Sequence, residues 1–228
     1  MALSHSPSIV TSGLVLCLDA GNSKSYPGSG TTWYDLSGNG NNGTLTNMDG
    51  TNFNSDNGGS LTFDGSNEYI ALSQSITLDF NKTFIFYIQN VPSTGIYHLL
   101  NSVSIGAFNN RISITRTNLN FYDGDDGNND LISTSFTGGS KANRFFAIVT
   151  DSSNLYTIEP DMTSFPTGSS LGGLVDGARS FDSIGYQSSG SGWNYFNGNI
   201  NCFYYYNKSL SLQEIQQNFN ALRSRFSI

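Results

Sequence analysis

The chain has 228 residues, of which 37% are hydrophobic and 12% are charged, and its formal net charge is −7. This length and hydrophobic content suit one all-β domain, because β-sandwiches of roughly 200 to 250 residues fold without splitting. The low basic content leaves no positive stripe to offset phosphate charge, which argues against binding to nucleic acid or to an anionic membrane. No segment approaches the ~20 apolar residues that span a bilayer. The expected partner is therefore a protein or a neutral glycan.

Residues 1–12 show no hydrophobic periodicity and contain Pro7 among scattered Ser and Thr. They lack the basic region and the long apolar run of a secretory signal, so no signal peptide is expected. We interpret them as an N-terminal arm, which is either a disordered terminus or a docking segment that becomes ordered on a neighbouring subunit.

Residues 12–47 run from an apolar strand into a long loop of Gly, Asn, Ser and Asp. The pairs Asn39-Gly40 and Asn42-Gly43 favour positive φ, which predicts two chain reversals within a few residues. Asp side chains in such loops accept backbone N–H bonds, as in Asx-turns. We assign loop-structural roles to Asp35, Asn39, Asn42 and Asp64. Trp33 and Tyr34 are expected to anchor the loop on the core.

Short β-branched or aromatic runs separated by turn-forming clusters recur along the chain. They predict strands over 14–18, 61–63, 69–72, 83–88, 97–100, 111–116, 145–150, 155–158 and 200–206. In 111–116 the residues Ile112 and Ile114 point to one face and the polar residues to the other, as in a half-buried strand. Many strands without intervening helices predict a sandwich or barrel.

The C-terminal segment carries the helix signal. Ser211 and Glu214 form a capping box. An apolar stripe with helical spacing follows it, made of Leu212, Ile215, Phe219, Leu222 and Phe226. The stripe either packs on the sandwich or serves as a contact between subunits, so a homo-oligomer is left open.

Three motifs occur in the order expected of one known fold. They are the opening stretch 12–47, the Phe-Asp-Gly hairpin LTFDGSNEYIAL at 61–72, and FNGNINCFYYYNKSLSLQEI at 196–215. The chain resembles laminin-G-like domains of the concanavalin A-like lectin/glucanase superfamily, and especially those in structural proteins of marine bacteriophages. The resemblance implies an all-β fold: a concanavalin A-like antiparallel β-sandwich (jelly roll) with one short C-terminal helix. It divides the chain into the arm at 1–12, the sandwich at 13–207 and the packed helix at 208–228.

The same resemblance implies a non-enzymatic component of a phage virion, such as a capsid decoration, neck or tail fibre protein. Its partners would be other virion proteins and host-surface glycans, and its place would be the virion surface after synthesis in the host cytoplasm. The alternatives are a free carbohydrate-binding lectin and, less favoured, a glycan-degrading enzyme.

Enzyme activity is not expected, because retaining glycosidases need two carboxyl groups about 5 to 5.5 Å apart. Glu occurs only at positions 68, 159 and 214, far apart in sequence. No cofactor is predicted and no metal ligands are assigned. Calcium is left open at an acidic turn containing Asp123, Asp125, Asp126 and Asp130. The spacing there does not support an EF-hand, since Gly127 stands at the fifth position.

Aromatic residues are abundant, and flat rings with polar tips suit sugar binding. The segment 185–198 places Tyr186, Trp193 and Tyr195 around a flexible Ser/Gly loop, which makes these three the candidate glycan-binding residues. The alternative is that the rings pack between the sheets. Cys17 and Cys202 fall on the first and last predicted strands, which lie near each other in the family that the chain resembles. A disulfide is conceivable, but buried free thiols are favoured.

Overall fold

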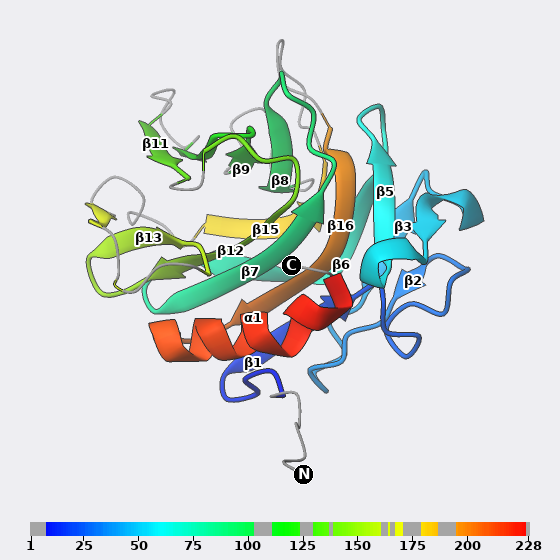
Figure 1. Ribbon diagram of the computed structural model, residues 1–228, viewed down its shortest axis with the longest axis horizontal. Helices are drawn as coiled ribbons and strands as arrows, with labels where there is room; N and C mark the ends of the chain where they lie inside the picture. The colour runs from blue at the N-terminus through cyan, green and yellow to red at the C-terminus, as the bar shows by residue number, and fades with distance from the viewer. Residues whose placement is uncertain are drawn as a thin grey trace.

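A computed structural model of the chain describes residues 8–102, 111–123, 130–136, 139–160, 164, 167–170, 179–186 and 195–226. Two antiparallel sheets stack face to face, and one α-helix covers the outer face of the first sheet (Figure 1). The expected all-β jelly-roll sandwich with a single C-terminal helix is confirmed for the described residues.

The helix-side sheet, called sheet A, is built around the long strand β16. Its order is β14 (Ser169–Ser170), β13 (Asn154–Ile158), β12 (Arg144–Thr150), β7 (Lys82–Gln89), β16 (Asn197–Tyr206), β5 (Ser60–Asp64) and β4 (Phe53–Asn54). Strand β1 (Leu14–Asp19) pairs with the second half of β16. Short 3₁₀ turns at Gly50–Asn52 and Asp56–Gly58 flank β4.

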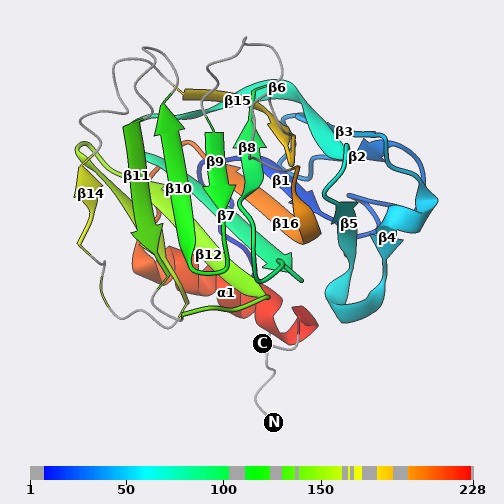
Figure 2. The ribbon, with the colours of Figure 1, turned by 90° about the horizontal axis from the view of Figure 1, so that it is seen from above.

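The opposite sheet, called sheet B, forms the other layer (Figure 2). Its order is β11 (Asp130–Ser135), β10 (Asn118–Asp123), β9 (Arg111–Ile114), β8 (Tyr97–Asn101), β15 (Arg179–Ile184), β6 (Tyr69–Leu78), β3 (Gly43–Thr46) and β2 (Thr32–Trp33). Neighbouring strands pair antiparallel throughout, so each strand alternates between the inner face and the outer face of its sheet.

Strand β16 contributes to two separate hydrophobic cores. Phe203 and Tyr205 point into the main core between the two sheets. Cys202, Tyr204 and Tyr206 point into a second core between sheet A and the helix. Because successive side chains of a strand alternate, one apolar strand can support both layers.

Helix α1 (Leu212–Phe226) begins with the predicted capping box: the Glu214 N–H donates to Ser211 Oγ (3.3 Å), and the Ser211 N–H donates to Glu214 Oε2 (2.9 Å). Ile215 and Leu222 are buried, and Phe226 stacks on Tyr87 of β7 at 4.2 Å. The apolar stripe therefore packs against the chain's own sheet. None of the described helices is long and apolar enough to cross a membrane.

The part of the N-terminal arm that the structure describes, from residue 8, is bound to the helix. The Val10 N–H donates to Asn218 Oδ1 (2.8 Å), and the Tyr206 hydroxyl donates to the Val10 carbonyl (2.9 Å). Val10 is buried in the second core. Disorder is therefore the wrong expectation for residues 8–10, which are bonded to the chain's own helix and to β16. The cause is the buried Asn218, whose amide on the apolar side of the helix supplies an acceptor. Residues 1–7 lie outside the described residues.

Cys17 and Cys202 are buried free thiols on the adjacent strands β1 and β16. Burial raises the pKa of the Cys17 thiol far above its usual range and that of Cys202 to about 12, with the nearby Asp19 carboxylate adding to both shifts. Both side chains therefore stay protonated at neutral pH and act as small apolar groups.

Replacing Asn218 with Ala should lower the free energy of unfolding by about 1 to 3 kcal/mol, because the buried Val10 N–H loses its acceptor. Urea denaturation measures the loss, and limited proteolysis should show faster cleavage near residue 8. The exposed Gln213→Ala variant on the same helix should match the parent. Equal stability of the two variants would contradict the role given to Asn218.

Candidate functional site

The long loop after β1 is held by the carboxylate of Asp35. Its Oδ1 accepts from the backbone N–H of Cys17 (2.9 Å) and of Ser37 (2.8 Å). Its Oδ2 accepts from the Ser37 hydroxyl (2.7 Å) and the Asn41 N–H (3.0 Å). Four donors thus converge on one side chain and join the loop to β1.

The two asparagines assigned to this loop act through their side chains. Asn42 Oδ1 accepts from the Asp35 N–H (2.9 Å), and Asn39 Nδ2 donates to the Val15 carbonyl (3.1 Å). Of the two Asn-Gly pairs, only Gly40 has positive φ, at 75°. The second predicted reversal is wrong, because Gly43 is the first residue of β3. An added Cβ there would lie 2.5 Å from Ile70 Cγ2, so close packing and not turn geometry requires this glycine.

Asp64 closes a turn after β5, where its Oδ1 accepts from the Ser66 N–H (2.7 Å). The residue that ties this hairpin together is Glu68, which the sequence did not single out. Its carboxylate accepts from the Asp64 N–H (2.7 Å) and from Asn52 Nδ2 (2.7 Å). Asp35 and Asp64 therefore lie in two separate loop anchors.

Trp33 and Tyr34, at the end of β2, point in different directions. Trp33 is fully buried in the main core, as expected of an anchor. Tyr34 is 46% exposed, so its expected anchoring role is wrong. Successive residues along an extended segment face opposite sides, and only the first of the two can reach the core.

A cluster of three tyrosines lies where β6 begins and β15 ends. The Tyr69 and Tyr186 ring centroids are 5.0 Å apart, and those of Tyr186 and Tyr195 are 5.7 Å apart, both edge to face. All three are half-buried. Two of the three candidate glycan-binding residues thus meet, Tyr69 joins them, and Trp193 lies outside the described residues. Burial, with smaller contributions from Tyr186 and Tyr69, raises the pKa of Tyr195, so the hydroxyl stays protonated.

Beside this cluster is an open hollow of about 430 Å³. Its described lining is Tyr69, Ala71, Leu72, Ser73, Gln74, Ser75 and Asp182. The tyrosine cluster therefore borders a cavity whose other side chains are mostly hydrogen-bonding groups. We call the cluster and this hollow the tyrosine site.

The outer face of sheet B continues from the tyrosine site as a row of buried polar side chains. Ile112 and Ile114 point into the main core as predicted, but Ser113 between them is buried instead of solvated. It pairs across the strands with His98 and Asn120, which are also buried. Burial, followed by the nearby Arg111 charge, lowers the pKa of His98 to about 3, so the imidazole is neutral at ordinary pH.

Within the described residues, no group of three or more His, Cys, Asp and Glu side chains is placed to hold a metal ion. Asp123 and Asp130 are paired at the end of the β10–β11 hairpin. Asp125 and Asp126 lie outside the described residues, and so does the turn proposed for calcium.

No family model matches the chain, and no curated protein matches it. Solved structures do. Trypanosoma rangeli sialidase in complex with sialic acid aligns with a TM-score of 0.62 and 14% identity over 97% of this chain and 36% of the sialidase. The binding domain of botulinum neurotoxin DC in complex with rat synaptotagmin II aligns with a TM-score of 0.60 and 18% identity, over 93% of this chain and 52% of the toxin chain. The receptor binding domain of the botulinum neurotoxin C/D mosaic serotype aligns with a TM-score of 0.56 and 15% identity, over 91% of this chain and 51% of the toxin chain.

At these identities the similarity shows a shared fold, which is a lectin-like β-sandwich. The chain spans from 36% to 52% of the length of these structures.

Replacing Asp35 with Ala should lower the free energy of unfolding by about 1 to 3 kcal/mol, because the Cys17 and Asn41 N–H groups lose their acceptor. Thermal and urea denaturation with added calcium and with chelator should give the same loss, since the role is structural. The exposed Asp56→Ala variant is the matched control and should be neutral. A calcium-dependent difference between Asp35→Ala and the parent would refute this role.

Proposed function

We propose that the chain is a non-enzymatic glycan-binding module and that the tyrosine site holds the sugar. The observation that carries this proposal is the meeting of Tyr69, Tyr186 and Tyr195 beside a hollow lined by hydrogen-bonding side chains. Solved structures with the same fold include a sialidase in complex with sialic acid and binding domains of botulinum neurotoxins, which supports a binding role.

The chemistry of the site favours a neutral sugar. Tyrosine rings can cover the apolar C–H faces of a pyranose, and their hydroxyls reach hydrogen-bond partners. Asp182 offers carboxylate acceptors for sugar hydroxyl groups, and Gln74 and Ser73 offer both donors and acceptors. The net charge of −7 disfavours acidic sugars, so a neutral hexose fits better.

The non-enzymatic part of the proposal is supported by where the glutamates lie. Glu68 holds the Asp64 hairpin, Glu159 is paired with Arg144, and Glu214 caps the helix. Asp182 is the one carboxylate in the described lining of the hollow. A glycosidase mechanism with two carboxyl groups across one sugar bond therefore finds no support in the tyrosine site.

We further propose that the module works on the surface of a phage particle, in contact with other virion proteins. The three motifs at 12–47, 61–72 and 196–215 support this setting through their resemblance to phage structural proteins. Repeated display would strengthen attachment, because many weak contacts on one particle combine.

The Tyr186→Ala variant should bind a neutral glycan at least about tenfold more weakly than the parent, because the central ring of the cluster is lost. A glycan array identifies the ligand, and titration calorimetry measures the affinity. Tyr34→Ala removes an exposed tyrosine elsewhere and should bind normally. Thermal melting checks that both variants are folded. Unchanged binding by Tyr186→Ala, or an equal loss in both, would place the sugar elsewhere, and release of reducing sugar would indicate an enzyme.

The virion setting predicts that the chain occurs in purified phage particles at a fixed ratio to the major capsid protein. Quantitative mass spectrometry of particles from the source measures this ratio, and the copy number separates a decoration from a tail position. Absence from well-purified particles would favour the free lectin.

A further inference from the structure

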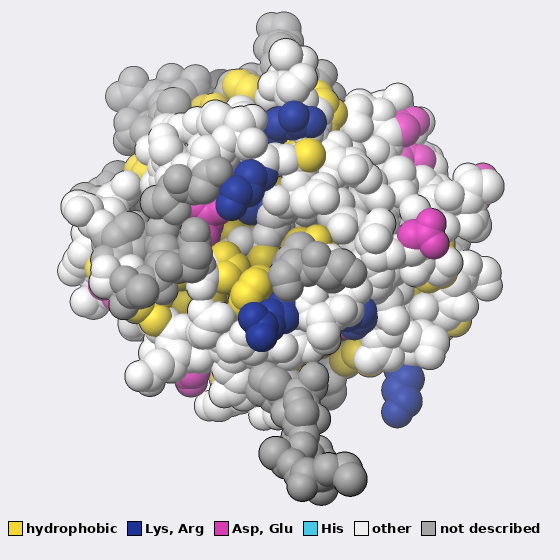
Figure 3. Space-filling model, viewed as in Figure 1, with side chains coloured by type: hydrophobic (Ala, Val, Ile, Leu, Met, Phe, Trp, Pro, Cys, Tyr) yellow, Lys and Arg dark blue, Asp and Glu magenta, His cyan; other side chains and the backbone are white. Residues whose placement is uncertain are grey.

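A second hollow lies on the opposite side of the molecule, where helix α1 meets β12 and β7 of sheet A. Figure 3 shows hydrophobic side chains gathered in it above the helix, with basic side chains at its border. Its volume is about 280 Å³. The described lining is Tyr87, Lys141, Asn143, Arg144, Phe145, Glu159, Pro160 and Phe219. We call it the helix pocket.

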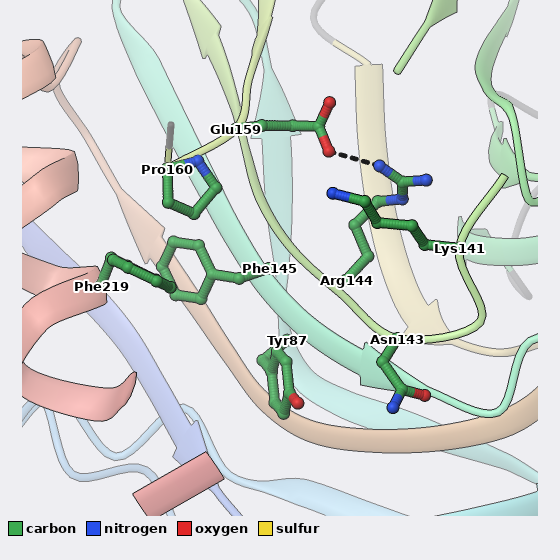
Figure 4. A pocket seen from close by; sticks show the side chains of 8 residues that line it. All are labelled: Tyr87, Lys141, Asn143, Arg144, Phe145, Glu159, Pro160 and Phe219. Atoms are coloured by element: carbon green, nitrogen blue, oxygen red, sulfur yellow. Dashed lines mark hydrogen bonds and ion pairs between the residues drawn. The ribbon is translucent and has the colours of Figure 1, made fainter. Parts of the chain in front are cut away.

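The floor of the helix pocket is aromatic. Phe145 of β12 meets Phe219 of the helix edge to face, with ring centroids 5.3 Å apart (Figure 4). Phe219 belongs to the apolar stripe of the helix but stays only partly buried, whereas Ile215 and Leu222 of the same stripe are buried. The helix therefore leaves part of an aromatic ring uncovered at this point.

One wall of the helix pocket is a buried ion pair between Arg144 and Glu159. Arg144 also donates to the carbonyls of Gly139 (2.6 Å) and Arg116 (3.0 Å), and its guanidinium lies 3.7 Å from the centroid of the Phe136 ring. The pair is thus neutral as a unit and fixed in place, and the guanidinium charge is already compensated.

Lys141 is the uncompensated charge of the helix pocket. Its side chain is exposed and has no ion-pair partner among the described residues. In the view of Figure 4 its ammonium group lies next to the Arg144–Glu159 pair, on the side that faces Phe145 and Phe219. An ammonium beside an apolar floor can bind an anionic group while the rings bind an apolar group.

We propose that the helix pocket binds a small aromatic carboxylate, with its ring against Phe145 and Phe219 and its carboxylate on Lys141. Pockets for drug-sized ligands are roughly 300 to 1,000 Å³. The helix pocket, at about 280 Å³, lies just below this range, so it suits a ligand with one ring and a short acidic side chain. A neutral sugar would leave the Lys141 charge without a counter-ion. An uncharged aliphatic ligand would gain nothing from the Lys141 charge.

The test uses 3-phenylpropionate as the probe and its amide, 3-phenylpropanamide, as the uncharged match, both measured by ligand-observed NMR and calorimetry on the full chain. The acid should bind about tenfold more tightly than the amide. Lys141→Gln should remove this difference by weakening acid binding about tenfold while leaving amide binding unchanged. Lys24→Gln, at another exposed lysine, should behave as the parent.

Phe219→Ala should weaken the acid and the amide together, with thermal melting to confirm that the helix still packs. Tyr186→Ala should bind the acid normally, which separates failure of the tyrosine site from failure of the helix pocket. The proposal is overturned if neither probe binds, if the amide binds as well as the acid, or if Lys141→Gln and Lys24→Gln behave alike.

Discussion

Strand β16 is buried on both faces and paired along both edges, and the rest of the sandwich depends on it. Phe203 and Tyr205 fill the main core, whereas Cys202, Tyr204 and Tyr206 support the helix. Strand β7 runs along one edge, and the other edge is divided between β5 and β1. A slip of one residue would exchange the side chains of the two cores, so register and layer order are set by the same strand.

The positions of both candidate sites follow from what each sheet packs on its outer face. Sheet A carries packing on both of its faces, and the ring of Phe219 is partly uncovered at the helix border. The apolar core lies on the inner face of sheet B, and its outer face carries polar side chains, some of them buried, and the tyrosine site. Two hollows of opposite chemistry result: one is mostly polar and contains Asp182, and the other is aromatic and bordered by Lys141.

Much of the fold could be predicted from the sequence where strands are apolar or alternate, as in 83–88 and 200–206, and where the Ser211 cap begins the helix. Strands β10, β11 and β15 and the short strands β2, β3, β4 and β14 were not predicted, because pairing partners and not composition define them. The same limit applies to the tyrosine site. The antiparallel pairing of Ile184 with Ile70 brings Tyr186 to Tyr69, which is 117 positions away in the chain. Burial of His98 and Ser113 also depends on the whole sheet and leaves no local pattern.

The bonding of residues 8–10 to helix α1 places both end segments of the described chain on one side of the sandwich. Ser8 and Val10 are hydrogen-bonded to side chains of this helix, so the first and last described segments lie together on the outer face of sheet A (Figure 1). The tyrosine site lies on the other layer. A chain tethered to a support through either of these segments would turn the tyrosine site outward and hold the helix pocket close to the support.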